Sequence, residues 1–375
     1  MARRFTDNTM TTGAPILHGM NLSTSENLLA DRVVAAMEGV TPGVVLRAYR
    51  RGELLCDCRA GATYDFYDLA SLTKVVFAQQ ALMRAFDQGR WTADSRVADY
   101  LPDFAHGQIR LVDLMTHTSG MTWWKPLYES LALDRSREQK RRWLYDALAR
   151  DEVVPTGKAV YSDLGFMLLG FLLECMHDRD LLSVWNGLRE RSYADSALAF
   201  SVDNIAPQAR ERYAPTEDCP WRGKRLQGEV HDDNTWALGG VSTHAGLFGG
   251  IDDLAAFGRM LRAQVLGLPA SGVRPATAQW CSRRAIDAKD GDWALGFMLP
   301  SATGSSCGRH LAATSIGHTG FTGTSVWFDP QNDLLVLILS NRVSLGRENR
   351  SFITLRPQLH DWVCELFCPD MPCVR

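Results

Sequence analysis

The sequence predicts an α/β chain, of the α+β kind, in which an antiparallel sheet flanked by helices is joined to a mainly helical second domain. Three observations support this fold class. A hairpin pattern lies near the start of the chain, short apolar strand patterns lie near its end, and residues 100–240 are rich in helix and loop patterns. With 375 residues, 46% hydrophobic and 22% charged, the chain can bury a large core and is not disordered.

The first part of the expected sheet is a hairpin over residues 43–60, which turns at Arg51-Gly52. Cys56 and Cys58 fall on one face of its second strand and are interpreted as ordinary apolar residues. The segment 71–89, SLTKVVFAQQALMRAFDQG, then carries apolar residues at helical spacing. It predicts a mostly buried helix that ends near Gly89.

The second part of the sheet is expected from the last third of the chain. The apolar patterns there predict strands over 293–298, 310–317, 322–328 and 334–340. Turns are expected at Gly304, at Gly320 and over 330–333. An amphipathic helix over 254–268 precedes these strands, and a helix over 351–367 closes the chain.

The expected domain organisation is discontinuous. Residues 22–100 and 241–375 form the sheet domain, residues 101–240 form the mainly helical domain, and the active site lies between them. Residues 1–21 contain basic side chains but no apolar run of seven, so they are interpreted as a flexible leader and not as a signal peptide or membrane anchor. Nine cysteines at scattered spacing indicate no disulfide framework and favour the cytoplasm, with the periplasm as the alternative if an export signal is missing.

Composition excludes several classes of partner. The formal charge of −3 and the pI of about 6.3 argue against nucleic acid. The basic run 135–142 is interpreted as the solvated face of a helix. Cys364, Cys368 and Cys373 have no histidine at ligand spacing, so no metal and no other cofactor is expected. The oligomeric state stays open.

The strongest chemical signal is Ser71-Leu72-Thr73-Lys74 at the start of the first long helix. Lys74 is one of six lysines among 40 basic residues, and a buried lysine can lose its proton whereas an arginine cannot. Residues i and i+3 share a helix face, so the Ser71 hydroxyl would lie beside an amine able to act as its base. The alternative is a capping serine followed by a solvated lysine.

Two further segments later in the chain add to this signal. Tyr161-Ser162-Asp163 precedes an apolar helix pattern, and His318-Thr319-Gly320 precedes the last strands. In this order, the three segments resemble the signatures of the penicillin-recognising serine hydrolases, which include class C β-lactamases, D-Ala-D-Ala carboxypeptidases and related esterases. The block 114–120 resembles a further block of this family, and the blocks 228–232, 238–241 and 244–248 are similar to a subgroup near penicillin-binding protein 4B.

The resemblance implies a β-lactamase/transpeptidase-like fold and a role for each motif residue. Ser71 Oγ would attack an acyl carbonyl, with Lys74 and Tyr161 as the base pair, each lowering the proton affinity of the other. Tyr161 would return the proton to the leaving group, although a lone tyrosine here would ordinarily be a core residue. The N–H groups of Ser71 and Phe321 would form the oxyanion hole, and Gly320 would leave room for the substrate.

Two residues depart from the β-lactamase pattern. Asp163 replaces an asparagine and His318 replaces a lysine, so the site lacks the permanent cation that would hold a substrate carboxylate. Asp163, His318, Thr319 and Gly320 are expected to contact the substrate. The departures favour small esters or amides over β-lactams.

Other candidates keep more than one interpretation. The polar group Glu229, His231, Asp232, Asp233 and His244 could structure a loop, contact the substrate or bind a metal, although its spacing fits no standard metal site. His117 and Ser119 are expected to fix a turn. Trp123, Trp124, Tyr128 and Trp221 either wall the cleft or belong to the core.

The leading hypothesis is a cofactor-free serine hydrolase that forms an acyl-enzyme on Ser71 and acts on small acyl substrates. The alternatives are an efficient β-lactamase or D-Ala-D-Ala carboxypeptidase, an acyl transferase, and a sensor module that deacylates slowly. The residues do not distinguish these, because all four share the acylation step.

Overall fold

The computed structural model describes residues 24–201, 207–269 and 272–375. Its main sheet has five antiparallel strands in the order β2-β1-β10-β9-β8. They are β1 (Gly43–Arg50), β2 (Glu53–Gly61), β8 (Ile316–Thr319), β9 (Ser325–Asp329) and β10 (Leu334–Ser340). The sheet therefore joins the two ends of the chain, and the predicted fold class is confirmed.

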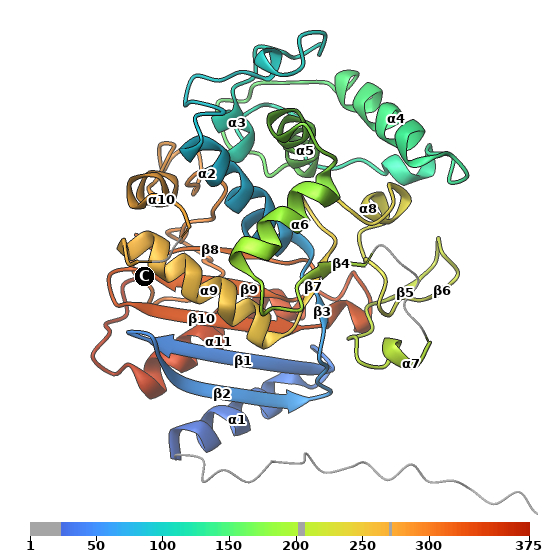
Figure 1. The fold of residues 1–375 in the computed structure, drawn as a ribbon. Coiled ribbons are helices and arrows are strands. Elements are labelled where there is room, and N and C mark those ends of the chain that lie inside the picture. The colour runs from blue at the N-terminus through green and yellow to red at the C-terminus, as the bar shows by residue number, and fades with distance from the viewer. Residues whose placement is uncertain (1–23, 202–206, 270–271) are drawn as a thin grey trace, which may run out of the picture.

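Helices cover both faces of this sheet (Figure 1). On one face, α1 (Thr24–Met37) and α11 (Ser351–Phe367) pack against alternate residues of β1 and β10, among them Leu46 and Ile338. On the other face, α9 (Ile251–Leu266) packs against Leu335 and Leu337, which belong to the larger core. The alternation along β10 follows from the two-residue period of a strand that is buried on both faces.

Most of the remaining helices gather beyond α9, away from α1 and α11 (Figure 1). They are α2 (Gln79–Asp87), α3 (Leu111–Met115), α4 (Arg137–Ala149), α5 (Asp163–His177), α6 (Leu181–Ser192), α8 (Asp233–Ala237) and α10 (Pro275–Ser282). The short helix α7 (Pro207–Arg210) lies apart from this group. Short strands β3 (Tyr67–Asp68), β4 (Ala199–Phe200) and β7 (Leu247–Gly249) form a second sheet, and β5 (Asp218–Cys219) pairs with β6 (Lys224–Arg225). The domain boundaries near residues 100 and 240 stay a prediction.

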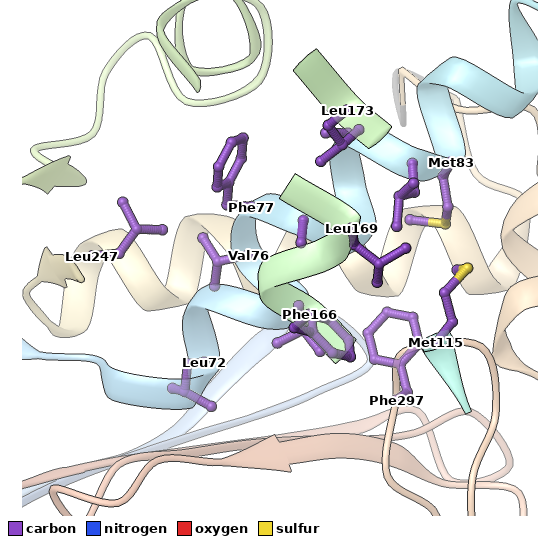
Figure 2. Packing of buried hydrophobic residues seen from close by; sticks show 14 of the residues in the cluster. Leu72, Val76, Phe77, Met83, Met115, Phe166, Leu169, Leu173, Leu247 and Phe297 are labelled. Atoms are coloured by element: carbon purple, nitrogen blue, oxygen red, sulfur yellow. The ribbon is translucent and has the colours of Figure 1, made fainter. Parts of the chain in front are cut away.

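The apolar helix α5 lies at the centre of the larger core. Figure 2 shows Phe166, Leu169 and Leu173 of α5 packed with side chains from the Ser71 helix, including Val76 and Met83. All five side chains are at most 2% exposed. This packing fixes the start of α5 relative to the start of the Ser71 helix, and both starts contribute to the site described below.

Several element predictions are confirmed and others are wrong. The hairpin, with its buried Cys56 and Cys58, and the closing helix appear as predicted. The strand predicted over 310–317 is wrong before Ile316, because the backbone turns there and the Ala312 N–H bonds the Asp329 carboxylate (2.9 Å). The strand over 293–298 is replaced by isolated bridges around a tight turn at Gly296, where φ is +79°.

Two further boundaries shift. The strand predicted from residue 322 begins at Ser325, because Gly320 and Gly323 close a turn in which the Gly323 N–H bonds the Gly320 carbonyl (3.1 Å). The helix predicted over 254–268 begins three residues earlier, at Ile251.

The expected leader, 1–21, lies outside the described residues. No helix in the described part of the chain is long and apolar enough to cross a membrane.

Candidate active site

Ser71 lies in a short turn between β3 and the helix that follows. The helix predicted over 71–89 is in fact composite, with a 3₁₀ turn, η1 (Ala70–Leu72), a π turn, η2 (Lys74–Ala78), and then α2. Ala70 has φ +47°, a left-handed conformation that non-glycine residues rarely adopt. The buried Asp68 carboxylate holds it there by accepting the Ala70 N–H (2.8 Å). Strain of this kind is typical of functional sites.

The structure brings Ser71, Lys74 and Tyr161 into one hydrogen-bonded group. Tyr161 Oη donates to Ser71 Oγ at 2.8 Å, and Lys74 Nζ lies 3.1 Å from the same oxygen. Lys74 is 0% exposed and also donates to Asp163 Oδ1 (2.7 Å) and to the His244 carbonyl (3.2 Å). The arrangement differs from a capping serine with a solvated lysine, because this lysine has no contact with solvent.

The expected mutual lowering of proton affinity in the base pair holds in one direction only, because Lys74 lowers the pKa of Tyr161 whereas Tyr161 raises the pKa of Lys74. Burial disfavours the Lys74 ammonium, but the Asp163 carboxylate and Tyr161 outweigh it, so the pKa of Lys74 is raised. Burial also raises the pKa of Tyr161, and the opposing effect of Lys74 does not cancel it. Sequence reasoning missed this because it treated Asp163 as a substrate contact, whereas the residue forms an ion pair with the lysine.

The start of α5 fixes Tyr161 and Asp163. Ser162 is the N-cap residue and accepts the Gly165 N–H (3.0 Å) through its hydroxyl, which in turn donates to the Thr122 carbonyl (2.7 Å). The Asp163 N–H bonds the Trp123 carbonyl (2.9 Å). Asp163 is the first helical residue, where a negative charge is stabilised by the helix dipole.

His318, Thr319 and Gly320 lie at the end of edge strand β8. The His318 ring is 1% exposed, and its centroid is 6.0 Å from that of Tyr161. Nδ1 lies 2.9 Å from the Thr319 carbonyl, which can only accept, so Nδ1 carries the proton. Burial, followed by the charge of Lys74, lowers the pKa of His318 to about 3. His318 is therefore neutral at pH 7.

Gly320 is required by packing, and the expectation that it also leaves room for a substrate stays a prediction. A Cβ at this position would lie 2.0 Å from Thr324 Oγ1 and 2.7 Å from the Leu69 carbonyl. The two hydroxyls of this loop tie it to the Ser71 turn, because Thr322 donates to the Asp68 carbonyl (2.7 Å) and Thr324 to the Leu69 carbonyl (3.1 Å).

Two arginines orient the peptide groups next to Phe321. Arg356, on α11, donates to the Gly320 carbonyl (3.1 Å), and Arg342 donates to the Phe321 carbonyl (2.8 Å). Neither the Ser71 N–H nor the Phe321 N–H donates a hydrogen bond within the described part of the chain. Burial, reinforced by Arg342, lowers the pKa of Arg356 to about 9. The sequence analysis did not identify either arginine. The only feature that could have indicated a role was Arg356, a charged residue on the otherwise apolar buried face of α11.

The polar group around His231 structures the loops behind the site. His244 is held through Nδ1 by Ser242 Oγ (2.7 Å) and through Nε2 by Asp232 Oδ1 (3.1 Å), and this fixes the carbonyl that Lys74 contacts. The His231 N–H donates to the Asp68 carboxylate (2.6 Å). Its ring stacks on Phe321 with centroids 5.5 Å apart, so it supports the loop of the expected oxyanion hole.

One group of possible metal ligands, Glu217, Cys219 and Asp233, occurs among the described residues. Arg222 pairs with Asp233 at 2.7 Å, and Arg347 contacts both carboxylates. Two guanidinium groups therefore already neutralise the cluster, and a divalent cation does not fit it. Glu229 lies outside it and pairs with Lys224 (2.8 Å).

The aromatic candidates are mostly surface residues. Trp123 is 60% exposed, with its ring 5.9 Å from that of Trp124. The rings of Tyr128 and Trp221 are tilted against each other with centroids 4.5 Å apart, and Trp221 is 38% exposed. Trp123 is joined to the site through its carbonyl, which accepts the Asp163 N–H. The structure thus places these rings outside the large core.

The fold and the serine-centred site define the class of the protein, and comparisons with known proteins agree. A family model described as Beta-lactamase matches residues 29–356. An N-acetylmuramyl-L-alanine amidase of Bacillus subtilis (strain 168) is 30% identical, over 79% of this chain and 72% of its own. A putative D-alanyl-D-alanine carboxypeptidase of Escherichia coli (strain K12) is also 30% identical, over 75% and 70%.

Solved structures show the same fold. EstCE1, described as a hydrolase with promiscuous acyltransferase activity, has a TM-score of 0.69 at 19% identity, over 90% of this chain and 98% of its own. A class C β-lactamase from Rhodobacter sphaeroides has a TM-score of 0.64 at 17% identity, over 90% and 99%. The chain belongs to the β-lactamase family, and it is a hydrolase of the penicillin-binding-protein-like serine type.

Proposed function

We propose that the protein hydrolyses small esters or amides through an acyl-enzyme on Ser71. One observation carries the proposal, which is that a single oxygen, Ser71 Oγ, lies within hydrogen-bond distance of both Tyr161 Oη (2.8 Å) and Lys74 Nζ (3.1 Å). A nucleophile in contact with an amine and a phenol has a short path for the proton it must lose.

The proposed reaction begins when the Tyr161/Lys74 pair has lost one proton. The pair takes the Ser71 proton as Oγ attacks the acyl carbonyl, and the oxyanion accepts hydrogen bonds from the N–H groups of Ser71 and Phe321. Tyr161 then donates a proton to the leaving group, the acyl-enzyme forms, and water releases the acid. Because the two groups are coupled, their titration belongs to the pair and to neither residue alone.

A time course with p-nitrophenyl butyrate tests the proposal. We expect continued turnover well beyond one equivalent of enzyme, because the site holds a base that can activate water for deacylation as well as serine for acylation. A single stoichiometric burst would indicate the slow-deacylating sensor instead. Faster product release with an added alcohol, accompanied by a new ester, would indicate the acyl transferase.

We expect Asp163→Asn to shift the acidic limb of the kcat/KM pH profile to lower pH. The Asp163 carboxylate raises the pKa of Lys74, and its removal lowers that pKa, so the proton-accepting form of the pair is populated at lower pH. Removing one opposite charge at this range shifts a pKa by about 1–3 units. The profile with p-nitrophenyl butyrate measures the shift. An unchanged limb would show that the Lys74/Asp163 pair does not control the reacting proton.

We expect neutral short esters to be better substrates than nitrocefin. His318 is neutral at pH 7, so it supplies no fixed cation for the β-lactam carboxylate. His318→Lys adds that cation and should shift the ratio of kcat/KM for nitrocefin to that for p-nitrophenyl butyrate by about ten- to a hundredfold, because a charge-assisted hydrogen bond contributes about 1.5–3 kcal/mol. A wild-type enzyme that is already fast on nitrocefin would instead be an efficient β-lactamase.

A further inference from the structure

His117 makes two backbone contacts on either side of Tyr161. Its carbonyl accepts the Val160 N–H at 2.8 Å, and its ring nitrogen Nδ1 accepts the Ser162 N–H at 3.0 Å. One residue, 44 positions earlier in the chain, therefore holds the backbone N–H groups of the two residues that flank the tyrosine. Among the described residues, no group outside His117 accepts a hydrogen bond from either of these two N–H groups.

The His117 ring also packs against the tyrosine itself. The centroids of His117 and Tyr161 are 4.7 Å apart, and Trp293 completes the group at 4.3 Å from His117 and 5.9 Å from Tyr161. The rings of His117 and Trp293 therefore both pack beside Tyr161, and Lys74 Nζ lies 4.8 Å from the centroid of the Tyr161 ring. A ring held in this way has little freedom to move its hydroxyl away from Ser71.

The protonation state of His117 follows from its contacts. Because Nδ1 accepts a backbone N–H, it carries no proton, and the neutral ring carries its proton on Nε2. His117 is 2% exposed, and Nε2 has no hydrogen-bond partner in the described part of the chain. Burial and then the charge of Lys74 hold the pKa of His117 well below its ordinary value, so Nδ1 stays an acceptor at neutral pH.

The backbone of His117 is strained. Its φ of +59° is left-handed, which costs energy for any residue with a Cβ. Such conformations persist only where the surroundings impose them, and here the strain aims both the carbonyl and Nδ1 at the segment that carries Tyr161. A turn that served only to reverse the chain would be filled at lower cost by glycine or asparagine.

We infer that His117 is the positioning residue of Tyr161, and that it acts mainly by accepting the Ser162 N–H, with the packing of its ring against the phenol as a smaller contribution. This inference rests on the proposed function, since it gives Tyr161 a reacting proton to hold in place. His117 thereby has a larger role than the turn-fixing one expected from the sequence. The inference gives His117 no contact with the substrate.

Three variants separate the two parts of this role. His117→Phe keeps an aromatic ring and removes the acceptor, whereas His117→Asn keeps an acceptor and tolerates the positive φ. Tyr161→Phe removes the reacting hydroxyl. The readouts are kcat and KM with p-nitrophenyl butyrate, and a fluorophosphonate titration gives the fraction of enzyme that is active.

We expect His117→Phe to lower kcat about 10- to 100-fold with KM unchanged, which is the scale for a misplaced catalytic group. His117→Asn should stay within about tenfold of the wild type. In the Tyr161→Phe background, His117→Phe should cause no further loss, because a residue that acts only through Tyr161 has nothing left to position.

Three results would overturn the inference. They are full activity in His117→Phe, an asparagine variant as damaged as the phenylalanine variant, and an undiminished effect of His117→Phe in the Tyr161→Phe background, which would mark a purely structural residue. If His117→Phe does not fold, the asparagine variant decides by the tenfold criterion. Full activity in Tyr161→Phe would overturn both the proposed role of Tyr161 and this inference. If Tyr161→Phe is inactive while His117→Phe is fully active, only this inference is overturned.

Discussion

Ser71→Ala is expected to abolish turnover of p-nitrophenyl butyrate while leaving the fold unchanged. The substitution removes the one oxygen that Tyr161 and Lys74 both contact, so no acyl-enzyme can form at this position. The helix start does not depend on that oxygen, because the hydrogen bonds of Ser71 Oγ go to the side chains of Lys74 and Tyr161 and not to the backbone. A rate indistinguishable from that without enzyme is the expected result.

Mass spectrometry provides an independent measurement of the same claim. After reaction with a fluorophosphonate, the wild-type protein should carry one adduct on the peptide that contains Ser71, and Ser71→Ala should carry none. Ser351→Ala is a matched control, since Ser351 is an exposed serine at the start of α11 on the other face of the sheet. An adduct elsewhere, or activity that survives in Ser71→Ala, would contradict the central proposal.

The sequence was sufficient for the parts of the fold that depend on local pattern. The hairpin turns at Arg51-Gly52, and the β10 run and the closing helix lie where their periodicity predicted them. The wrong strand over 310–317 shows the limit, because an apolar run cannot reveal that the Asp329 carboxylate captures the Ala312 N–H and turns the chain. Tertiary hydrogen bonds of this kind have no signature in a short window.

For the candidate site, the sequence named three residues that the structure brings together, but it did not reveal their charges. Ser71, Lys74 and Tyr161 were named from motif order, yet the resting proton distribution depends on Asp163, which lies 2.7 Å from the lysine and 89 positions away in the sequence. In the same way, nothing local to His117 indicates that it bonds Ser162, because the contact exists only after α3 and α5 have packed together. Long-range electrostatics and packing supplied what the motifs did not.

The second large effect is expected at Lys74, where arginine should be nearly as damaging as methionine. Lys74→Met removes the amine, and Lys74→Arg keeps a positive charge beside Asp163 but cannot lose its proton. Removing a positioned base lowers kcat/KM by about 10²-fold or more. Lys74 is also fully buried, so the larger guanidinium has no solvent-facing space to occupy.

Stability separates the chemical effect from damage to the fold. Replacing both members of a buried ion pair by apolar residues of similar volume is often neutral, but Lys74→Met leaves Asp163 without its partner. We therefore expect the free energy of unfolding to fall by up to about 3–5 kcal/mol. The loss should be smaller than this limit, because the Asp163 side chain is 17% exposed and water can solvate it. In the double variant Lys74→Met/Asp163→Asn, much of that stability should return while activity stays lost. Urea unfolding and kcat/KM, measured on the same preparations, give both values.

Lys289→Arg serves as the control for arginine substitution as such, since the Lys289 side chain is 78% exposed, and it should leave both activity and stability unchanged. If Lys74→Arg retained substantial activity, Lys74 would be an electrostatic residue that stabilises charge at Tyr161 and Ser71, and the base would have to be Tyr161 alone. The pH profile of that variant would then report the ionisation of Tyr161 in the field of a permanent cation.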